Sequence, residues 1–327
     1  MSTKIVFKRT INEPYYNRIK KYRTQIKHLD NIETYQCLNA VKKTNGYFEY
    51  EISHGNIILK EQIGSKSKYG VIFLTKNKFS NIMYATKLTP QNIYNYNELQ
   101  ISKKLSNVTI ADKSPHFLII YKFIFCNENY NVNLPEIIDK STYYISINEL
   151  ADGNLKNFFD VNIDPKLTLN AYQQILIAIL SFHYFTNNYY HNDCHYKNFL
   201  FHKIKPGGFF HYNIYGKDIY IENMGYLWMI WDFGLVRTNT GIYKYNQLKD
   251  YFRLNSMFKR SSFNSSMFSL LDTFVFQLKS LEFSFIDLIG NSDKKLFENY
   301  LFKMPELFTF SIKKTGKIIN KNPYLIS

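Results

Sequence analysis

The chain has 327 residues, a formal net charge of +15 and 45% hydrophobic residues. This apolar content excludes a disordered protein, and the length is sufficient for two lobes around one shared cleft. No apolar run is long enough to cross a membrane, and the first ten residues lack the apolar core of a signal peptide. The three cysteines are widely spaced and odd in number, so they indicate no disulfide framework. We therefore expect a soluble protein in a reducing, intracellular compartment.

The first 50 residues are expected to form a basic extension, with tyrosines between the basic residues. Eight basic residues precede Asp30: Lys4, Lys8, Arg9, Arg18, Lys20, Lys21, Arg23 and Lys27. Basic residues with interleaved aromatic rings can bind nucleic acid or an anionic membrane surface. We favour a helical arm that packs on the rest of the protein, because runs of charge usually lie on solvated faces. The positive charge also favours an acidic protein substrate.

A hairpin with a glycine-containing turn is predicted for residues 63–73, IGSKSKYGVIF. Gly64 and Ser65 begin the turn, and Gly70 and Val71 lead into the second strand. Because Gly and Ser occupy turns of many kinds, this segment alone indicates only a structural hairpin. Its place ahead of the segments below makes it a candidate phosphate-binding loop.

A strand and a helix follow the hairpin. Residues 82–88 alternate apolar and polar side chains, as a β-strand does, and place Ala85 two residues before Lys87. Residues 91–105 have apolar side chains at helical spacing and include Glu98. A helix there can turn Glu98 back toward the sheet, where it would form an ion pair with Lys87 that is partly shielded from water.

Two further apolar elements are predicted in the middle of the chain. Residues 143–150 read as a strand that ends in Glu149 and Leu150, and residues 151–155 open a short helix. Residues 167–187 are apolar at three- and four-residue spacing, which is too apolar for a surface helix. We therefore predict a long buried helix that leads into the next loop.

The most informative segment is the polar loop HNDCHYKN, from His191 to Asn198. Asp193 and Asn198 are five residues apart, and Asp232 opens an Asp-Phe-Gly turn 34 positions after Asn198. Carboxylate and amide oxygens on two turns suit a hard cation such as Mg²⁺. A positioned carboxylate can also accept a proton as a general base. The pattern therefore indicates phosphoryl transfer.

In this order the segments resemble the protein-kinase-like superfamily over about residues 57–235. The resemblance implies ATP and Mg²⁺ as cofactors, Asp193 as catalytic base, Lys87 on the phosphates and Glu98 as the residue that orients Lys87. It implies Asn198 and Asp232 as metal ligands. It implies a nucleotide site formed by Gly64, Ser65, Gly70, Val71, Ala85, Lys87, Glu149, Leu150, Asn198 and Asp232, with Glu149 and Leu150 contributing backbone groups of the hinge.

Several features differ from the usual protein kinase pattern. The turn lacks a middle glycine, Asn192 replaces an Arg, His195 replaces a Lys, and no Ala-Pro-Glu follows the Asp-Phe-Gly. Such a loop is similar to those of aminoglycoside and choline kinases and of divergent serine/threonine kinases of large DNA viruses. Residues 203–224 read as an extra hairpin. The many Asn, Ile, Lys, Tyr and Phe residues are typical of an AT-rich genome, so a viral protein of the host cytoplasm or virion is one expectation.

We predict an α+β, two-lobed, protein-kinase-like fold. The kinase-like domain should span residues 51–312, after the basic extension 1–50 and before a tail at 313–327. Its N-lobe, 51–150, should hold an antiparallel sheet and a helix, and its C-lobe, 151–312, should be mainly helical and atypical. The predicted function is ATP- and Mg²⁺-dependent phosphoryl transfer to Ser or Thr of a protein.

Two alternative functions remain open, and a zinc site is a competing chemical interpretation. A small-molecule phosphotransferase is favoured by His195, and a pseudokinase that only binds a partner is suggested by the incomplete glycine loop. A zinc site would use His183, His191, Cys194 and His195. Their spacing matches no usual paired zinc pattern, so we favour core or loop-packing roles for the first two. Either Asp250 or Asp272 is expected to brace the catalytic loop.

Overall fold

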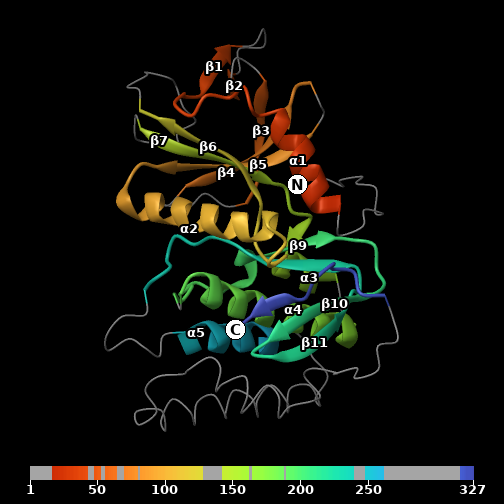
Figure 1. Cartoon of the computed structure of the whole chain (residues 1–327). Coiled ribbons are helices and arrows are strands. Elements are labelled where there is room, and N and C mark those ends of the chain that lie inside the picture. The colour runs from red at the N-terminus through yellow and green to blue at the C-terminus, as the bar shows by residue number, and fades with distance from the viewer. Residues whose placement is uncertain are drawn as a thin grey trace.

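The protein folds into two lobes, each with its own cluster of buried apolar side chains (Figure 1). The computed structural model describes residues 17–42, 48–52, 56–64, 70–79, 82–127, 142–161, 164–187, 189–238, 247–260 and 317–327. Strands dominate the N-lobe, and the C-lobe mixes helices with short strands. The predicted α+β two-lobed class is therefore confirmed. In the described parts of the chain, no helix is both long and apolar enough to span a membrane.

The N-lobe is built on a seven-stranded antiparallel sheet in the order β1-β2-β3-β4-β5-β7-β6. Its strands are β1 (Asn39–Lys42), β2 (Phe48–Ile52), β3 (Ile57–Gln62), β4 (Val71–Asn77), β5 (Met83–Pro90), β6 (Ile120–Cys126) and β7 (Tyr143–Glu149). Every residue of β7 is buried, as expected for a central strand. The sheet begins at Asn39, so the expected boundary at residue 51 falls inside β2.

Two helices flank the N-lobe sheet. The helix α2 (Ile93–Ile110) lies between the sheet and the C-lobe (Figure 1). It begins after Asn92, whose side chain accepts a hydrogen bond from the backbone of Asn95 at 2.8 Å and so caps the first turn. The helix α1 (Asn17–Lys27) comes from the basic extension and packs on the N-lobe core through Ile19 and Tyr22. A helical arm therefore does pack on this lobe.

Cys37 and Cys126 form a disulfide, which corrects the prediction drawn from cysteine number and spacing. The two residues are 89 positions apart, yet their Cα atoms lie 4.6 Å apart. The segment before Cys37 runs beside the end of β6, where the amide of Gln36 donates to the carbonyl of Phe125 at 3.1 Å. This long-range pairing, which has no local sequence signal, brings the two sulfur atoms together.

The C-lobe contains three described α-helices, a short 3-10 helix, η1 (Tyr196–Asn198), and two small three-stranded sheets. The helices are α3 (Leu155–Val161), α4 (Pro165–Phe185) and α5 (Gln247–Arg260). One sheet has β8 (Gly153–Asn154), β9 (Phe199–Lys203) and β12 (Tyr226–Ile230), and the other has β10 (Phe209–Ile214), β11 (Lys217–Glu222) and β13 (Tyr324–Ile326). The hairpin β10-β11 confirms the extra hairpin predicted at 203–224. The end of the chain, β13, pairs in parallel with β10 (Figure 1).

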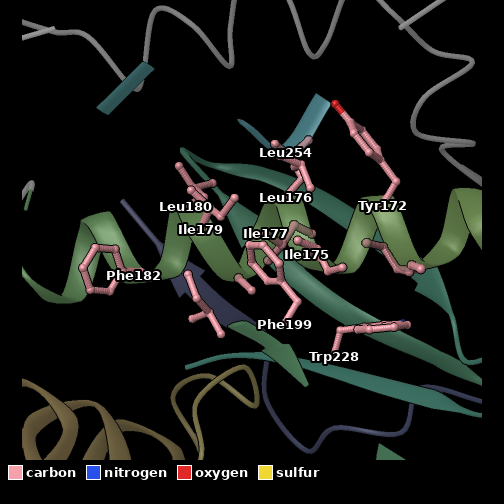
Figure 2. Close-up of a cluster of buried hydrophobic side chains, with 14 of the residues drawn as sticks. Tyr172, Ile175, Leu176, Ile177, Ile179, Leu180, Phe182, Phe199, Trp228 and Leu254 are labelled. Atoms are coloured by element: carbon pink, nitrogen blue, oxygen red, sulfur yellow. The ribbon is translucent and has the colours of Figure 1, made fainter. Parts of the chain in front are cut away.

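The helix α4 runs through the centre of the C-lobe core. Asp164 caps it by accepting a hydrogen bond from the amide of Lys166 at 2.8 Å, and Pro165 fits the first turn because that position needs no amide donor. All side chains from Asn170 to His183 are buried. Figure 2 shows Ile175, Leu176, Ile179 and Phe182 along this helix, with Phe199, Trp228 and Leu254 around it. A helix that is buried on all sides over Asn170–His183 thus forms the core that supports the following loop.

Candidate active site

The predicted lysine and glutamate meet under the N-lobe sheet. Lys87 on β5 lies opposite Ser146 of β7, and its ammonium Nζ is 2.5 Å from Oε1 of Glu98 on α2. The same Nζ lies 3.1 Å from Oδ1 of Asp232, which belongs to the C-lobe. The side chains of Lys87 and Glu98 are 7% and 4% exposed, so this contact is shielded from water. We call Lys87, Glu98 and Asp232 the lysine cluster.

The lysine cluster shares one ammonium between two carboxylates. Burial alone would lower the pKa of Lys87, but the charges of Asp232 and Glu98 outweigh it and raise that pKa. Burial raises the pKa of Glu98, and the charge of Lys87 only partly offsets it. Burial opposes ionisation of Asp232 as well, but Lys87 holds the pKa of this carboxyl below its usual value. An ionised Asp232 at the mouth of the cluster suits a cation.

The Asp-Phe-Gly turn is fixed from below by its phenylalanine. Phe233 is buried in the C-lobe core, where its ring stacks on Phe182 at 5.4 Å and meets the edge of His191 at 5.5 Å. Asp232 has a φ of +66°, a left-handed conformation that Asp tolerates better than most residues. A Cβ on Gly234 would lie 3.3 Å from Oε2 of Glu98, so glycine allows α2 to approach closely. Together these constraints direct the Asp232 carboxylate toward Lys87.

Asp193 and Asn198 lie together in the loop after α4. The Asn198 side-chain amide donates from Nδ2 to the Asp193 carbonyl at 2.9 Å and to Asp193 Oδ2 at 3.1 Å. This network orients the amide, so its Oδ1 is left as an acceptor for another group. The amide of Trp231 donates to the Asn198 carbonyl at 2.9 Å and brings Asp232 beside the loop. Asn198 and Asp232 carry the oxygen donors that could hold a magnesium ion.

Asp250 on α5 braces the loop from its buried side. Its carboxylate accepts hydrogen bonds from the backbone amides of His191 at 2.6 Å and Asn192 at 2.9 Å. His183 lies 3.0 Å away through Nε2. Burial would raise the pKa of Asp250, but the His183 hydrogen bond and neighbouring amide and imidazole groups lower it. Asp250 is therefore in the bracing position, and its rival Asp272 lies outside the described residues.

Two basic side chains border Asp193. His195 Nε2 lies 3.4 Å from Asp193 Oδ2, and Arg253 Nη1 on α5 lies 3.9 Å from Asp193 Oδ1. Arg253 also donates to the carbonyl of Asn192. The sequence analysis did not identify Arg253, although its place three residues after Asp250 puts it on the same face of α5. The Asp193 side chain stays 29% exposed and can meet an acceptor.

The described part of the glycine loop consists of its two ends. Gly64 has a φ of +80°, Gly70 has a φ of +150°, and Ser65 lies outside the described residues. A Cβ on Gly70 would lie 2.4 Å from the carbonyl oxygen of Leu88, so no other residue fits there without a shift of β4 or β5. Val71 is buried opposite Leu88, and both belong to the N-lobe sheet.

The segment from Asn148 to Leu150, predicted to be the hinge, has its own cluster of charges around Glu149. Ala85 of β5 lies opposite Asn148 of β7, and Leu150 follows that strand as a buried residue. The amide of Glu149 donates to the Ile119 carbonyl at 2.9 Å. The Glu149 side chain is also buried, with Arg18 Nε at 3.0 Å from Oε2. His202 Nε2 lies 3.1 Å from the same oxygen. Only the backbone of Glu149 was expected to take part in the site, and the contacts of its side chain with Arg18 and His202 were not predicted.

The four side chains of the alternative zinc site have other partners. His183 contacts Asp250 and Tyr251, and His191 Nε2 lies 3.0 Å from the Trp231 carbonyl. Cys194 is buried, and burial raises the pKa of its thiol. Across the described ranges, no three His, Cys, Asp or Glu side chains are grouped to hold a metal ion. The core role predicted for His183 is confirmed by its two contacts.

A comparison with solved structures finds similarity to a crystal structure of the BubR1 kinase domain, with a TM-score of 0.46 and 18% sequence identity. The match covers 76% of this chain and 75% of that chain. No family model matches the sequence, and no curated protein matches it. A likeness this distant carries no information on activity or on the roles of residues.

Proposed function

We propose that the protein is an ATP- and Mg²⁺-dependent kinase that transfers a phosphoryl group to Ser or Thr of a protein. The observation that supports this most is the lysine cluster. It joins β5, α2 and the Asp-Phe-Gly turn at one point, next to the loop that carries Asp193 and Asn198. An ion pair that only supports the fold does not require a second pair nearby, such as Asp193 and Asn198, in which a carboxylate and an amide lie five residues apart. Phosphoryl transfer does need it.

Each residue has a distinct task under this proposal. Lys87 binds phosphate oxygens, and Glu98 holds the lysine in place. Asn198 and Asp232 hold magnesium, which neutralises phosphate charge when bound. Asp193 accepts the proton of the acceptor hydroxyl, and its contact with Asn198 orients the carboxylate. The backbone around Glu149 and Leu150 receives the base of the nucleotide.

The acceptor class has one serious rival. His195, beside Asp193, occupies a position where protein kinases usually carry Lys, so a small-molecule hydroxyl is the second candidate. The net charge of +15 favours an acidic protein over a cationic aminoglycoside or choline, because like charges repel. We therefore place an acidic protein first.

The test is a transfer assay with purified full-length protein, labelled ATP and Mg²⁺. Acidic proteins, basic proteins, an aminoglycoside and choline serve as acceptors, and Asp193→Asn serves as the inactive control. Label on Ser or Thr of a protein supports the proposal. Label only on a small molecule selects the rival, and ATP binding without transfer to any acceptor identifies a pseudokinase.

A further inference from the structure

The N-terminal helix α1 inserts one arginine behind the hinge. Arg18 is only 9% exposed, although it belongs to a basic helix. Its guanidinium forms a two-pronged ion pair with Glu149, with Nε at 3.0 Å from Oε2 and Nη2 on Oε1. It also donates to the carbonyls of Pro115 and Phe117, each at 2.6 Å. A side chain that merely solvated the surface would not make four partly buried polar contacts with residues about 100 or more positions away.

The glutamate that Arg18 binds is linked to both lobes. Glu149 is the last residue of β7, and its Oε1 accepts the amide of Ile119 at 2.6 Å. Its Oε2 meets His202 on β9 in the C-lobe. His202 Nδ1 lies 3.5 Å from Asp152, whose Oδ2 accepts the amide of Lys203 at 2.9 Å. We call Arg18, Glu149, Asp152 and His202 the arginine cluster. Its charges alternate across the hinge.

The arginine cluster and the predicted base-binding segment share one stretch of backbone. Glu149 and Leu150 are the residues whose backbone groups are expected to receive the base, and Asp152 follows them by two positions. The Arg18 guanidinium and the His202 imidazole hold the side chains on either side of this stretch. A shift of either side chain therefore moves the hydrogen-bonding groups that face the nucleotide.

We propose that Arg18 is a positioning residue for nucleotide binding and that α1 is a working part of the kinase domain. The inference rests on the proposed function. Arg18 acts through Glu149 and the carbonyls of Pro115 and Phe117, which hold the hinge backbone in the conformation that receives the base. Arginine suits this task because its planar fork satisfies a carboxylate and two carbonyls at once. Lysine, with its compact ammonium, cannot make all these contacts.

The experiment compares three variants of the full-length protein. Arg18→Ala removes the fork, Arg18→Lys keeps the charge, and Arg23→Ala is the matched control because Arg23 is exposed on the same helix. The ATP dissociation constant, KM, kcat and Tm are measured for each. For Arg18→Ala we expect the Kd and KM for ATP to rise about tenfold, with kcat at saturating ATP nearly unchanged. Arg18→Lys should fall between Arg18→Ala and wild type, and Arg23→Ala should match wild type.

Chemical rescue separates positioning from general stability. Low millimolar guanidinium chloride can enter the space left by Arg18→Ala and should restore much of the ATP affinity, relative to sodium chloride at the same ionic strength. A lower Tm with unchanged ATP Kd and KM would overturn the inference and leave a structural role only. If Arg18→Ala does not fold, Arg18→Lys tests the inference in its place. Its KM for ATP should rise while its kcat at saturating ATP stays close to that of wild type.

The behaviour of the wild-type protein distinguishes an error in the role of Arg18 from an error in the proposed kinase function. Wild-type protein that binds ATP and transfers phosphate, together with an unaffected Arg18→Ala, would overturn the role of Arg18 alone. Wild-type protein that binds no ATP, with or without Mg²⁺, would overturn both. Wild-type protein that binds ATP without transfer would still test Arg18 through the dissociation constant.

Discussion

Glu98 and Glu149 are two buried glutamates that differ in the number of basic side chains around them. Glu98 shares a single ammonium with a second carboxylate, and burial raises its pKa. Burial would raise the pKa of Glu149 too, but the charges of Arg18 and His202 reverse this and lower that pKa well below its usual value. The lysine cluster thus has one basic side chain for two carboxylates, whereas the arginine cluster has two basic side chains, Arg18 and His202, for two carboxylates.

Because of this difference, we interpret the lysine cluster as a binding site, the open site, and the arginine cluster as a structural support, the brace. An unbalanced cluster that opens at Asp232, whose side chain is 38% exposed, leaves negative charge available to a cation. A balanced cluster in which Arg18, Glu149 and His202 are all about nine-tenths buried has no charge left for a ligand. Changes at the open site should therefore reduce turnover, and changes at the closed one should reduce stability and nucleotide affinity. Four predictions test this division.

The largest effect is expected at the open site. Asp193→Asn should lower kcat by about 10²- to 10⁴-fold, because it removes the base and keeps the shape of the side chain. Tm should stay close to wild type, since Asp193 is partly exposed and no buried charge is left behind. Steady-state transfer rates and thermal unfolding measure the two quantities. Asp160→Asn, at an exposed position, is the control. Near-normal turnover in Asp193→Asn would contradict the assignment.

The second prediction concerns the brace. Glu149→Gln should lower the free energy of unfolding by about 3–5 kcal/mol, because it leaves Arg18 and His202 buried without their counter-charge. The pKa of Glu149 is lowered, so its stabilisation is present above the ordinary value of 4.5 and is lost as pH falls toward the folded-state value. The difference between wild type and Glu149→Gln should therefore shrink on acidification, as measured by denaturant unfolding across pH.

Glu51→Gln is the control for the brace, because Glu51 lies on β2 and is only half-buried. Its effect on the free energy of unfolding should be smaller than that of Glu149→Gln. A Glu149→Gln protein as stable as this control would show that the arginine cluster contributes no net stability.

The third prediction treats Lys87 and Glu98 as one unit. Lys87→Met and Glu98→Gln should each lower turnover, and the double variant should lose far less than the sum of the two. The expected coupling energy is about 0.5–3 kcal/mol, as for contacting residues in one network. Transfer rates of the four proteins complete the cycle. Lys122→Met, from the partly exposed face of β6, combined with Glu98→Gln is the control pair. Strict additivity at Lys87 and Glu98 would point to two independent charges.

The smallest expected effect is a pH dependence of the free energy of unfolding that arises from His202. Burial alone would lower its pKa, but the charge of Glu149 and the hydrogen bonds of Asp152 and Glu149 raise it, despite the nearby charge of Arg18. The stabilisation by a protonated His202 is fully present below its ordinary value of 6.5 and is lost as pH rises through the folded-state value. Wild-type stability should decline over that interval, and the decline should be weaker in His202→Gln. His28→Gln, at an exposed position, should behave as wild type does.

Much of the open site could be predicted from the sequence. The order of Lys87, Glu98, Asp193, Asn198 and Asp232 was visible because phosphate chemistry demands particular residue types at short, fixed spacings. The helices and strands that carry them were visible because their apolar residues repeat with the period of each element. The contact between Lys87 and Glu98 followed from a strand and a helix that are adjacent in the chain.

The brace could not be predicted in this way. Arg18 and Glu149 are 131 positions apart, and no periodicity relates them. The basic run around Arg18 pointed to a solvated face, since charged residues are seldom buried. One signal was present: Ile19 and Tyr22, next to Arg18 and four residues after it, are apolar at helical spacing and mark the face that packs on the N-lobe.

The sequence by itself therefore determined the helices and strands that carry the candidate site residues and the spacing of those residues, because these depend on local composition and periodicity. Only the tertiary structure decided which distant side chains meet. It joined Cys37 to Cys126, placed Asp250 against the backbone of His191 and paired Arg18 with Glu149. The physical reason is that such contacts are formed by the pairing of whole strands and helices. The identity of a single residue does not indicate which distant residue this packing brings into contact with it.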